Sequence, residues 1–278
     1  MRYCRRHPQL IVGFAIVLGL LLFWLIGLAT VGTANAVPLS APPNLPPSAR
    51  YLLGTDSVGR QILPVMIAGT PLTLEVGLLA GSIGLSLGTI LGFAAGYFGS
   101  TVDTVIRSMA DVILPIPALA ILVVIASTFH QTMSVGLMAL VVASLAWMWP
   151  TRTIRSQVLS MRGRAYVEVA RFSGMGNFNI IVKELMPNLL PFLAASFVSA
   201  VGAAILAEIG LETLGLGPQT APTLGMTIFW AIYYGATLRG MWWWWGPPVA
   251  VIILIFIGLF LVSQGLDEIA NPRTRSAV

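Results

Sequence analysis

The chain has 278 residues, of which 57% are hydrophobic and only 9% are charged, and its mean hydropathy is +0.89. These values exclude an ordinary soluble domain, in which about a quarter of the residues are charged. The net charge of +5 does not indicate nucleic-acid binding, because the basic residues gather on one predicted side of a membrane.

Six apolar runs are long enough to cross about 30 Å of hydrocarbon, which takes about 20 helical residues. They cover approximately 9–31, 72–97, 110–128, 135–151, 188–208 and 246–265. We therefore predict an all-α polytopic membrane protein with six transmembrane helices. A cleaved signal peptide ending near Ala36 is the alternative for the first run, but this run is long for a signal and five more follow. The single Cys4 offers no disulfide framework.

The basic residues predict the topology. If the N-terminus is inside, only Arg50, Arg60 and Arg239 of the fifteen basic residues fall outside, which places both termini in the cytosol. The chain then divides into a cytosolic N-terminus with the first helix (1–31), an external linker with an amphipathic helix (32–71), a five-helix core (72–265) and a cytosolic tail (266–278). Within the core we expect a cytosolic loop at 152–187 and an external loop at 209–245.

The external linker contains Pro42, Pro43, Pro46 and Pro47, which favour extended backbone over helix. After it, Asp56 or Ser57 is a candidate cap for a short amphipathic helix that would lie along the outer membrane face. The apolar side of this helix would comprise Val58, Ile62, Val65 and Met66.

Glycines form a strip along the second run, at positions 77, 81, 84, 88, 92 and 96. Such a strip lets helix backbones approach closely in lipid. It predicts packing within the chain, with packing against a partner subunit as the alternative. In the third run, Pro115 and Pro117 predict a kink. The four tryptophans at 242–245 indicate an aromatic anchor at the external interface, with ligand stacking as the alternative.

A charged segment, Glu168 to Asn188, lies between two apolar runs. We predict a helix, a turn and a second helix that ends at a proline. The helix would contain Glu168, Gly174 would break it, and Pro187 would end the second helix. The external loop from Gly210 to Trp245 is long enough for a re-entrant or plug-like element, although an ordinary structured loop explains it equally well.

The sequence contains no constellation typical of an enzyme. Neither His7 nor His130 has zinc-type spacing, and no nucleophile elbow is present. Lys183 does not follow a phosphate-binding loop. We therefore predict no catalytic residue, no metal site and no cofactor bound by this chain.

The acidic residues lie near the predicted helix ends, which argues against a proton-coupled carrier. Glu75, Glu208 and Glu212 are at the predicted outer ends of the second and fifth runs, and Asp103 and Asp111 flank the inner end of the third. The three outer carboxylates either pair with polar groups in the headgroup zone or line the external mouth of a solute pathway.

Segment 168–188 resembles the EAA loop of ABC importer permeases, whose pattern is E-A-A, three residues, G and a later proline. Glu168, Ala170, Gly174 and Pro187 match this pattern, whereas Val169 replaces an alanine and Leu185-Met186 replaces Ile-Leu. LGTDSVGRQ at 53–61, AEIGLETLGLG at 207–217 and GLDEIANPRTR at 265–275 resemble further signatures, with departures at Gln61, Glu212 and Thr213. Over about residues 50–275, the chain resembles C-type permeases of the dipeptide, oligopeptide and nickel family.

This resemblance implies a type I ABC importer permease fold in a bacterial cytoplasmic membrane. It also implies a homologous second permease, two ATP-binding subunits that hold ATP and Mg, and an extracytoplasmic binding protein. The substrate would be a peptide, with nickel, glutathione or haem as alternatives, and an autonomous channel or secondary carrier is a remote alternative. The coupling helix would span 164–173, with Arg164 at its start and Glu168 at its centre. Val167, Ala170 and Arg171 would face the ATPase, Gly174 would form the exit turn and Pro187 would close the loop.

Overall fold

The computed structural model describes residues 8–129 and 133–270. The described residues form helices and loops without a β-strand, which confirms the all-α prediction. Expectations for Arg2, Cys4, Arg5, Arg6, His7, His130, Arg273 and Arg275, and for most of the predicted tail, lie outside the described residues.

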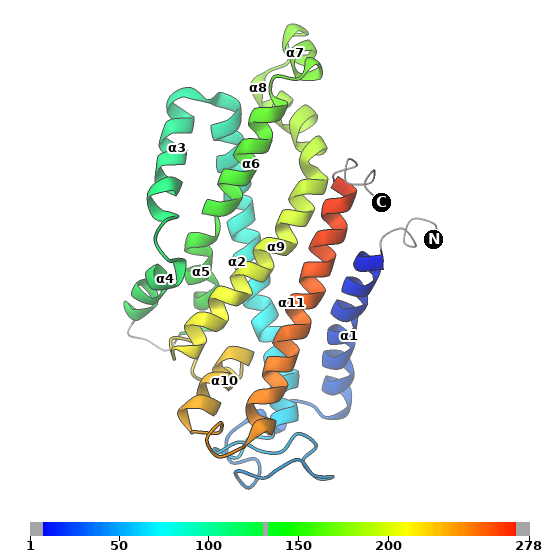
Figure 1. Cartoon of the computed structure of the whole chain (residues 1–278), viewed down its shortest axis with the longest axis vertical. Helices are drawn as coiled ribbons and strands as arrows, with labels where there is room; N and C mark the ends of the chain where they lie inside the picture. Colours follow the sequence, from blue (N-terminus) through cyan, green and yellow to red (C-terminus); the bar gives the residue numbers. More distant parts are fainter. Residues whose placement is uncertain (1–7, 130–132, 271–278) are drawn as a thin grey trace.

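Figure 1 shows long helices running roughly side by side, with a small helical tip at one end. The first half of the chain contains α1 (Pro8–Thr30), α2 (Ile62–Phe98), α3 (Ser100–Ile113), α4 (Ala118–Ser127), α5 (Val135–Ala146) and α6 (Met148–Met161). The second half contains α7 (Ala165–Phe172), α8 (Asn177–Asn179), the π-helical η3 (Ile180–Leu185), α9 (Met186–Thr213), α10 (Leu224–Tyr233) and α11 (Trp242–Ala270). A short 3₁₀ turn, η2, covers Ala34–Ala36.

Four described helices are long and apolar enough to cross a membrane: α1, α2, the continuous helix Asn177–Thr213, and most of α11. Two bent pairs reach the required length together. α3 and α4 meet at 84°, and α5 and α6 meet at 41°. Pro115 and Pro117 lie in the break between α3 and α4, which confirms the predicted kink. Counting each bent pair as one span gives up to six spans.

The glycine strip of α2 packs inside the chain. All six glycines are buried, and an ideal Cβ at Gly81 would lie 2.9 Å from the Cα of Val201 in α9. Farther along α2, the Cβ of Ile154 in α6 is only 2.9 Å from the Cβ position of Gly92. The strip therefore brings α2 against α9 at one end and against α6 at the other, which confirms packing within the chain.

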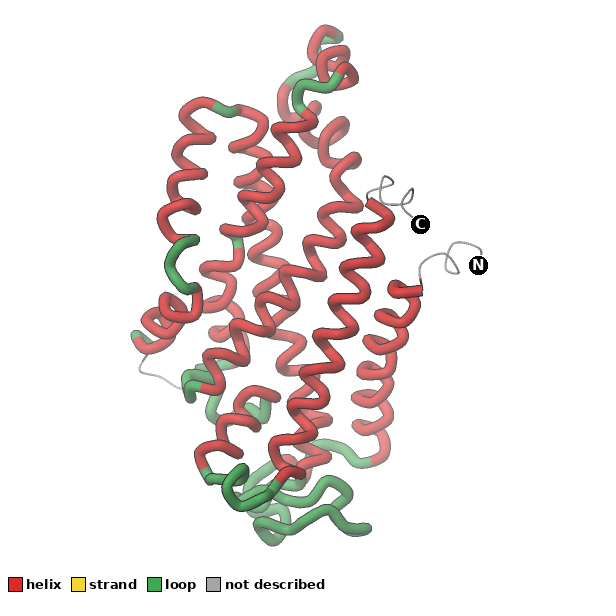
Figure 2. Tube along the Cα trace, viewed as in Figure 1, coloured by secondary structure: helices red, strands yellow, loops and turns green. Residues whose placement is uncertain are grey.

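The predicted amphipathic surface helix is wrong, because residues from Ile62 onward belong to α2. Ile62, Val65 and Met66 are buried in the bundle and do not face a membrane surface. Asp56 caps no helix. Its carboxylate accepts hydrogen bonds from the backbone N–H groups of Val58 (2.9 Å) and Arg60 (2.8 Å) and from the Arg60 side chain, so it holds a tight turn. Figure 2 shows the loops of this external segment gathered at one end of the bundle.

The tryptophan run begins α11, and its four rings differ in exposure, so they do not form one uniform exposed belt. Trp242 is exposed, but Trp244 is completely buried, and the indole of Trp243 donates to the carbonyl of Thr55 at 3.2 Å. The run therefore fastens the segment before α2 to the start of α11.

Several predicted boundaries need correction. Because α2 begins at Ile62, the external linker ends about ten residues earlier than 71. Within the predicted loop 152–187, α6 continues to Met161 and α8 begins at Asn177, so most of this stretch is helical. α9 continues to Thr213, past residue 209, where the external loop was predicted to begin. α11 continues to Ala270, past residue 266, where the tail was predicted to begin.

Candidate functional site

The helical tip is built around α7, which occupies the stretch predicted for the coupling helix. Arg164 is its N-cap residue, and Glu168 in the first turn and Arg171 in the last turn carry the charges that suit the helix dipole. At its C-terminus, Gly174 donates to the carbonyl of Arg171 and Met175 donates to that of Ala170, both at 3.1 Å. Gly174 has φ +79°. These two bonds form a Schellman motif, which ends the helix and reverses the chain. The left-handed backbone conformation at residue 174 favours glycine.

One side of α7 is anchored in the protein core. Val167 is 0% exposed and Ala170 is 7% exposed, and both belong to a buried cluster with Ile180, Leu185 and Leu189. The prediction that Val167 and Ala170 face a partner is therefore wrong. Burial also raises the pKa of the Tyr166 phenol, so this ring stays neutral at physiological pH.

The other side of the tip is exposed and partly apolar. Phe172 is 91% exposed, Phe178 is 76% exposed and Val169 is 63% exposed, and Glu168 and Arg171 lie on the exposed surface as well. Exposed aromatic rings on a rigid support are typical of a protein-binding surface. Sequence reasoning missed Val169 and Phe172 on α7 and Phe178 on α8, because apolar residues of α7 occur on both its buried and its exposed side.

The return from the tip to the bundle is a continuous helix. α8, η3 and α9 follow one another without a break, so Pro187 lies inside the continuous helix Asn177–Thr213, just after the π-helical η3. Pro187 therefore does not end the second helix, as had been predicted. Because α6 leads into α7 and η3 leads out of it, a displacement of the tip acts directly on two long helices.

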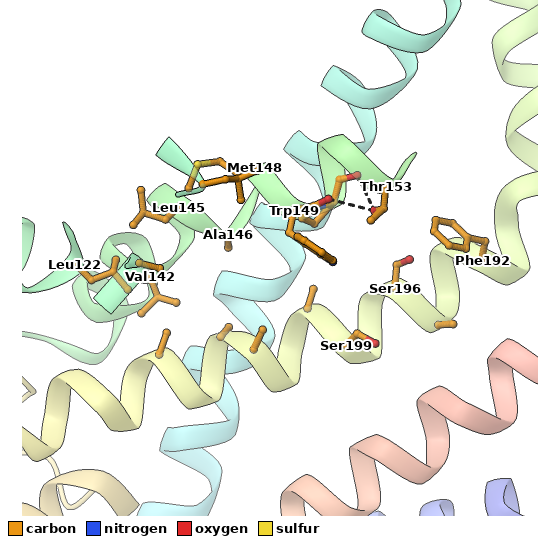
Figure 3. A pocket seen from close by; sticks show the side chains of 18 of the residues that line it. Leu122, Val142, Leu145, Ala146, Met148, Trp149, Thr153, Phe192, Ser196 and Ser199 are labelled. Atoms are coloured by element: carbon orange, nitrogen blue, oxygen red, sulfur yellow. Dashed lines mark hydrogen bonds between the residues drawn. The ribbon is translucent and has the colours of Figure 1, made fainter. Parts of the chain in front are cut away.

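A hollow of about 500 Å³ lies between the α4–α5–α6 wall and α9. Figure 3 shows side chains of α5 and α6, including Trp149, pointing toward those of α9, including Phe192. The α9 wall consists otherwise of small residues: Ala195, Ser196, Ser199, Ala200, Ala203, Ala204 and Ala207. Asp267 of α11 is the only charged residue among the described residues that line the hollow. Sequence reasoning missed this wall, although small residues recur along α9 at helical spacing.

The three outer carboxylates do not lie together in a mouth. Glu208 and Glu212 are 0% exposed, so their assignment to an external mouth is corrected. Glu212 accepts a hydrogen bond from the hydroxyl of Thr223 at 2.7 Å, and Thr223 caps α10. Glu212 therefore fastens the external loop, including α10, to α9.

Glu75 is exposed, but it does not lie at a helix end. It follows the first residue of α2 by 13 positions, or about 20 Å of helix. The sequence-based placement is wrong because α2 begins ten residues earlier than predicted. Among the described residues, no group of three or more potential metal ligands gathers.

Comparison with known proteins identifies the family. Residues 84–276 match the family described as binding-protein-dependent transport system inner membrane component. The chain belongs to this family. It is an ABC importer permease related to the dipeptide and oligopeptide permeases of C type, and a multi-pass protein of the inner membrane.

Individual relatives agree with this assignment. The chain is 30% identical to the dipeptide transport system permease protein DppC of Bacillus subtilis, over 84% of this chain and 72% of the relative. It is 28% identical to the oligopeptide transport system permease protein OppC of Mycobacterium bovis, over 83% and 79% of the two chains. It is also 28% identical to the glutathione transport system permease protein GsiD of Pectobacterium atrosepticum, over 78% and 72%.

Proposed function

We propose that this permease is one of two homologous membrane subunits of an ATP-driven peptide importer. It crosses the membrane six times with both termini in the cytosol, and the hollow beside α9 forms its half of the solute pathway. ATP and Mg are held by two separate ATP-binding subunits, and a binding protein delivers the solute from outside. The chain itself is not catalytic and binds no cofactor.

The exposed face of the tip carries this proposal. Phe172 and Val169 extend from a short helix whose opposite side is fixed in the core, and Phe178 of α8 adds a third exposed apolar residue, so a partner that binds this surface moves a rigid element. The α7 helix has the length and surface of a helix that lies in a partner's groove. The positive-inside pattern supports a cytosolic position for this face, on the side where ATP-binding subunits act.

Peptides are favoured as the substrate because relatives named for dipeptide and oligopeptide transport match most of the chain. Glutathione, named for another relative, is itself a peptide-like solute. Nickel or haem would be carried by a permease of the same architecture, so the hollow does not discriminate among them.

The deciding experiment compares the chain alone with the complete complex, both reconstituted in vesicles. We expect ATP-dependent uptake of radiolabelled dialanine only when the second permease, the ATP-binding subunits and the binding protein are present. Flux of dialanine through the chain alone would contradict the proposal and favour an autonomous channel or carrier. Uptake of nickel without dialanine by the complete complex would contradict the peptide assignment.

Glu75 is expected to favour cationic solutes. Glu75 does not line the hollow, so this prediction requires that the pathway also passes the exposed face of α2. An exposed carboxylate there attracts positive charge, and Glu75→Gln should lower uptake of lysyl-alanine about fivefold relative to dialanine, equivalent to ~1 kcal/mol for a partly screened pair. Glu208→Gln is the control, because its buried carboxylate should affect both solutes equally. If Glu75→Gln leaves the ratio of lysyl-alanine uptake to dialanine uptake unchanged, Glu75 does not lie on the solute pathway.

A further inference from the structure

α3 is only lightly packed against the rest of the bundle. Only Ala110 of its fourteen residues is buried. Figure 1 shows α3 at the edge of the molecule, beside the end of α2 that precedes it and near α6. Its exposed apolar residues are Val102, Val105, Met109 and Val112. With so little packing, a specific side-chain contact determines how α3 follows its neighbours.

The ion pair of Asp103 with Arg155 provides that contact. Asp103 is in the first turn of α3 and Arg155 is in the middle of α6. The guanidinium engages both carboxylate oxygens: Nε donates to Oδ1, and Nη2 donates to Oδ2 at 2.7 Å. Both side chains are only 19% exposed. A two-pronged, largely sheltered pair fixes orientation as well as distance.

A second ion pair on α3 lacks these properties. Arg107 and Asp111 are 3.6 Å apart on the same helix, with side chains 56% and 45% exposed. This pair joins α3 only to itself, and exposed pairs of this kind contribute little. It therefore offers a control for loss of charge on α3.

α6 connects this contact to the tip. Arg155 lies about two turns before the end of α6, and α7 begins four residues after that end. At the end of α6, Arg162 donates through Nη1 to the carbonyl of Gly96 in α2, at 3.1 Å. The backbone therefore joins the tip to α6. Arg162 joins the end of α6 to the end of α2, and Arg155 joins the middle of α6 to the start of α3.

α3 in turn leads to the hollow. Beyond the 84° bend it continues as α4, and Leu114, Ala118 and Leu122 from this part of the chain line the hollow opposite α9. A tilt of α3 would therefore move one wall of the hollow, while α9 carries the other.

We infer that the Asp103–Arg155 pair transmits displacement of the coupling tip to the α3–α4 wall of the hollow. This inference rests on the proposed importer function. The pair acts as a positioning element, since neither residue lines the hollow or lies on the exposed face of the tip. Without it, the tip would still move α6 and α9, but α3 would follow less closely, and only the contacts of α4 with α5 and α9 would carry movement to this wall.

The test measures movement of the α3–α4 wall in the assembled complex. In a Cys4→Ser background, spin labels at Ile116→Cys, in the bend, and Leu190→Cys, on α9, occupy two exposed sites. The distance between the labels is measured by pulsed electron paramagnetic resonance before and after trapping with ATP, Mg and vanadate. When the Asp103–Arg155 pair is intact, we expect ATP trapping to change the distance between the labels. This change should be at least threefold smaller in Asp103→Asn. It should return in the double variant Asp103→Arg with Arg155→Asp.

Asp111→Asn is the matched control and should retain the full distance change. The inference is overturned if the distance change in Asp103→Asn is as large as in the background. It is also overturned if Asp111→Asn reduces the distance change as much as Asp103→Asn does, or if the charge swap does not restore it. Copurification of the ATP-binding subunits and the thermal midpoint of each complex separate lost transmission from lost assembly. A background complex that binds no ATP-binding subunit, or shows no ATP-dependent change, contradicts the importer function itself.

Discussion

Replacing Phe172 with alanine should release the ATP-binding subunits from the purified complex and abolish uptake. The ring is 91% exposed at the end of α7, whose inner side is fixed by fully buried Val167. An exposed aromatic residue on a rigid helix is the kind of anchor whose loss costs ~2 kcal/mol or more at an interface, or about thirtyfold in affinity. Copurification of the ATP-binding subunits with a tagged permease, together with dialanine uptake in vesicles, measures the effect.

Phe260→Ala provides the matched control. Phe260 is also an exposed phenylalanine, at 62%, but it is in the membrane-spanning part of α11 and away from the tip. It should leave copurification and uptake intact, and Phe172→Ala should leave the thermal midpoint of the permease nearly unchanged. If the tip only rests on lipid headgroups, Phe172→Ala will retain its ATP-binding subunits, and the coupling role of α7 will be wrong.

The position of the tip was predictable from sequence, but its orientation was not. Gly174 marks a left-handed turn and the charges of Glu168 and Arg171 mark a polar helix, so local signals sufficed to place α7. Which side faces inward depends on the distant residues Ile180, Leu185 and Leu189. Because α7 has valine on both sides, at 167 and 169, its local pattern does not distinguish core from interface.

The error at the start of α2 has a similar cause. The surface helix predicted around Ile62 and the span predicted from residue 72 are one continuous helix, and Pro64 lies in its first turn, where no backbone bond is lost. Pro71 lies inside the helix, and neighbouring segments compensate for such residues in membrane bundles. The misplacement of Glu75 followed from this boundary. The hollow was not predictable because it is formed between helices, and no charged motif marks its wall of alanine and serine.

Replacing Gly88 with valine should prevent α2 from packing against α6. An ideal Cβ at Gly88 would lie 2.5 Å from the Cβ of Pro150, 2.9 Å from the carbonyl oxygen of Trp147 and 3.0 Å from the backbone nitrogen of Thr151. Two of these contacts are with backbone, so the helices must separate. We expect a loss of ~3 kcal/mol or more, the upper range for overpacking. Fluorescence-detected size-exclusion chromatography after heating measures the thermal midpoint.

The sign of the effect distinguishes packing from helix propensity. Alanine normally stabilises a helix relative to glycine by ~1 kcal/mol. Gly19 of α1 has no atom within 4 Å of its Cβ position, so Gly19→Ala should raise or maintain the thermal midpoint. At Gly88 even alanine meets Pro150 and the α6 backbone, so Gly88→Ala should lower it, and valine should lower it further. Equal midpoints for the two alanine variants would show that the glycine strip does not depend on close approach, and that α2 is held in the bundle by its larger side chains.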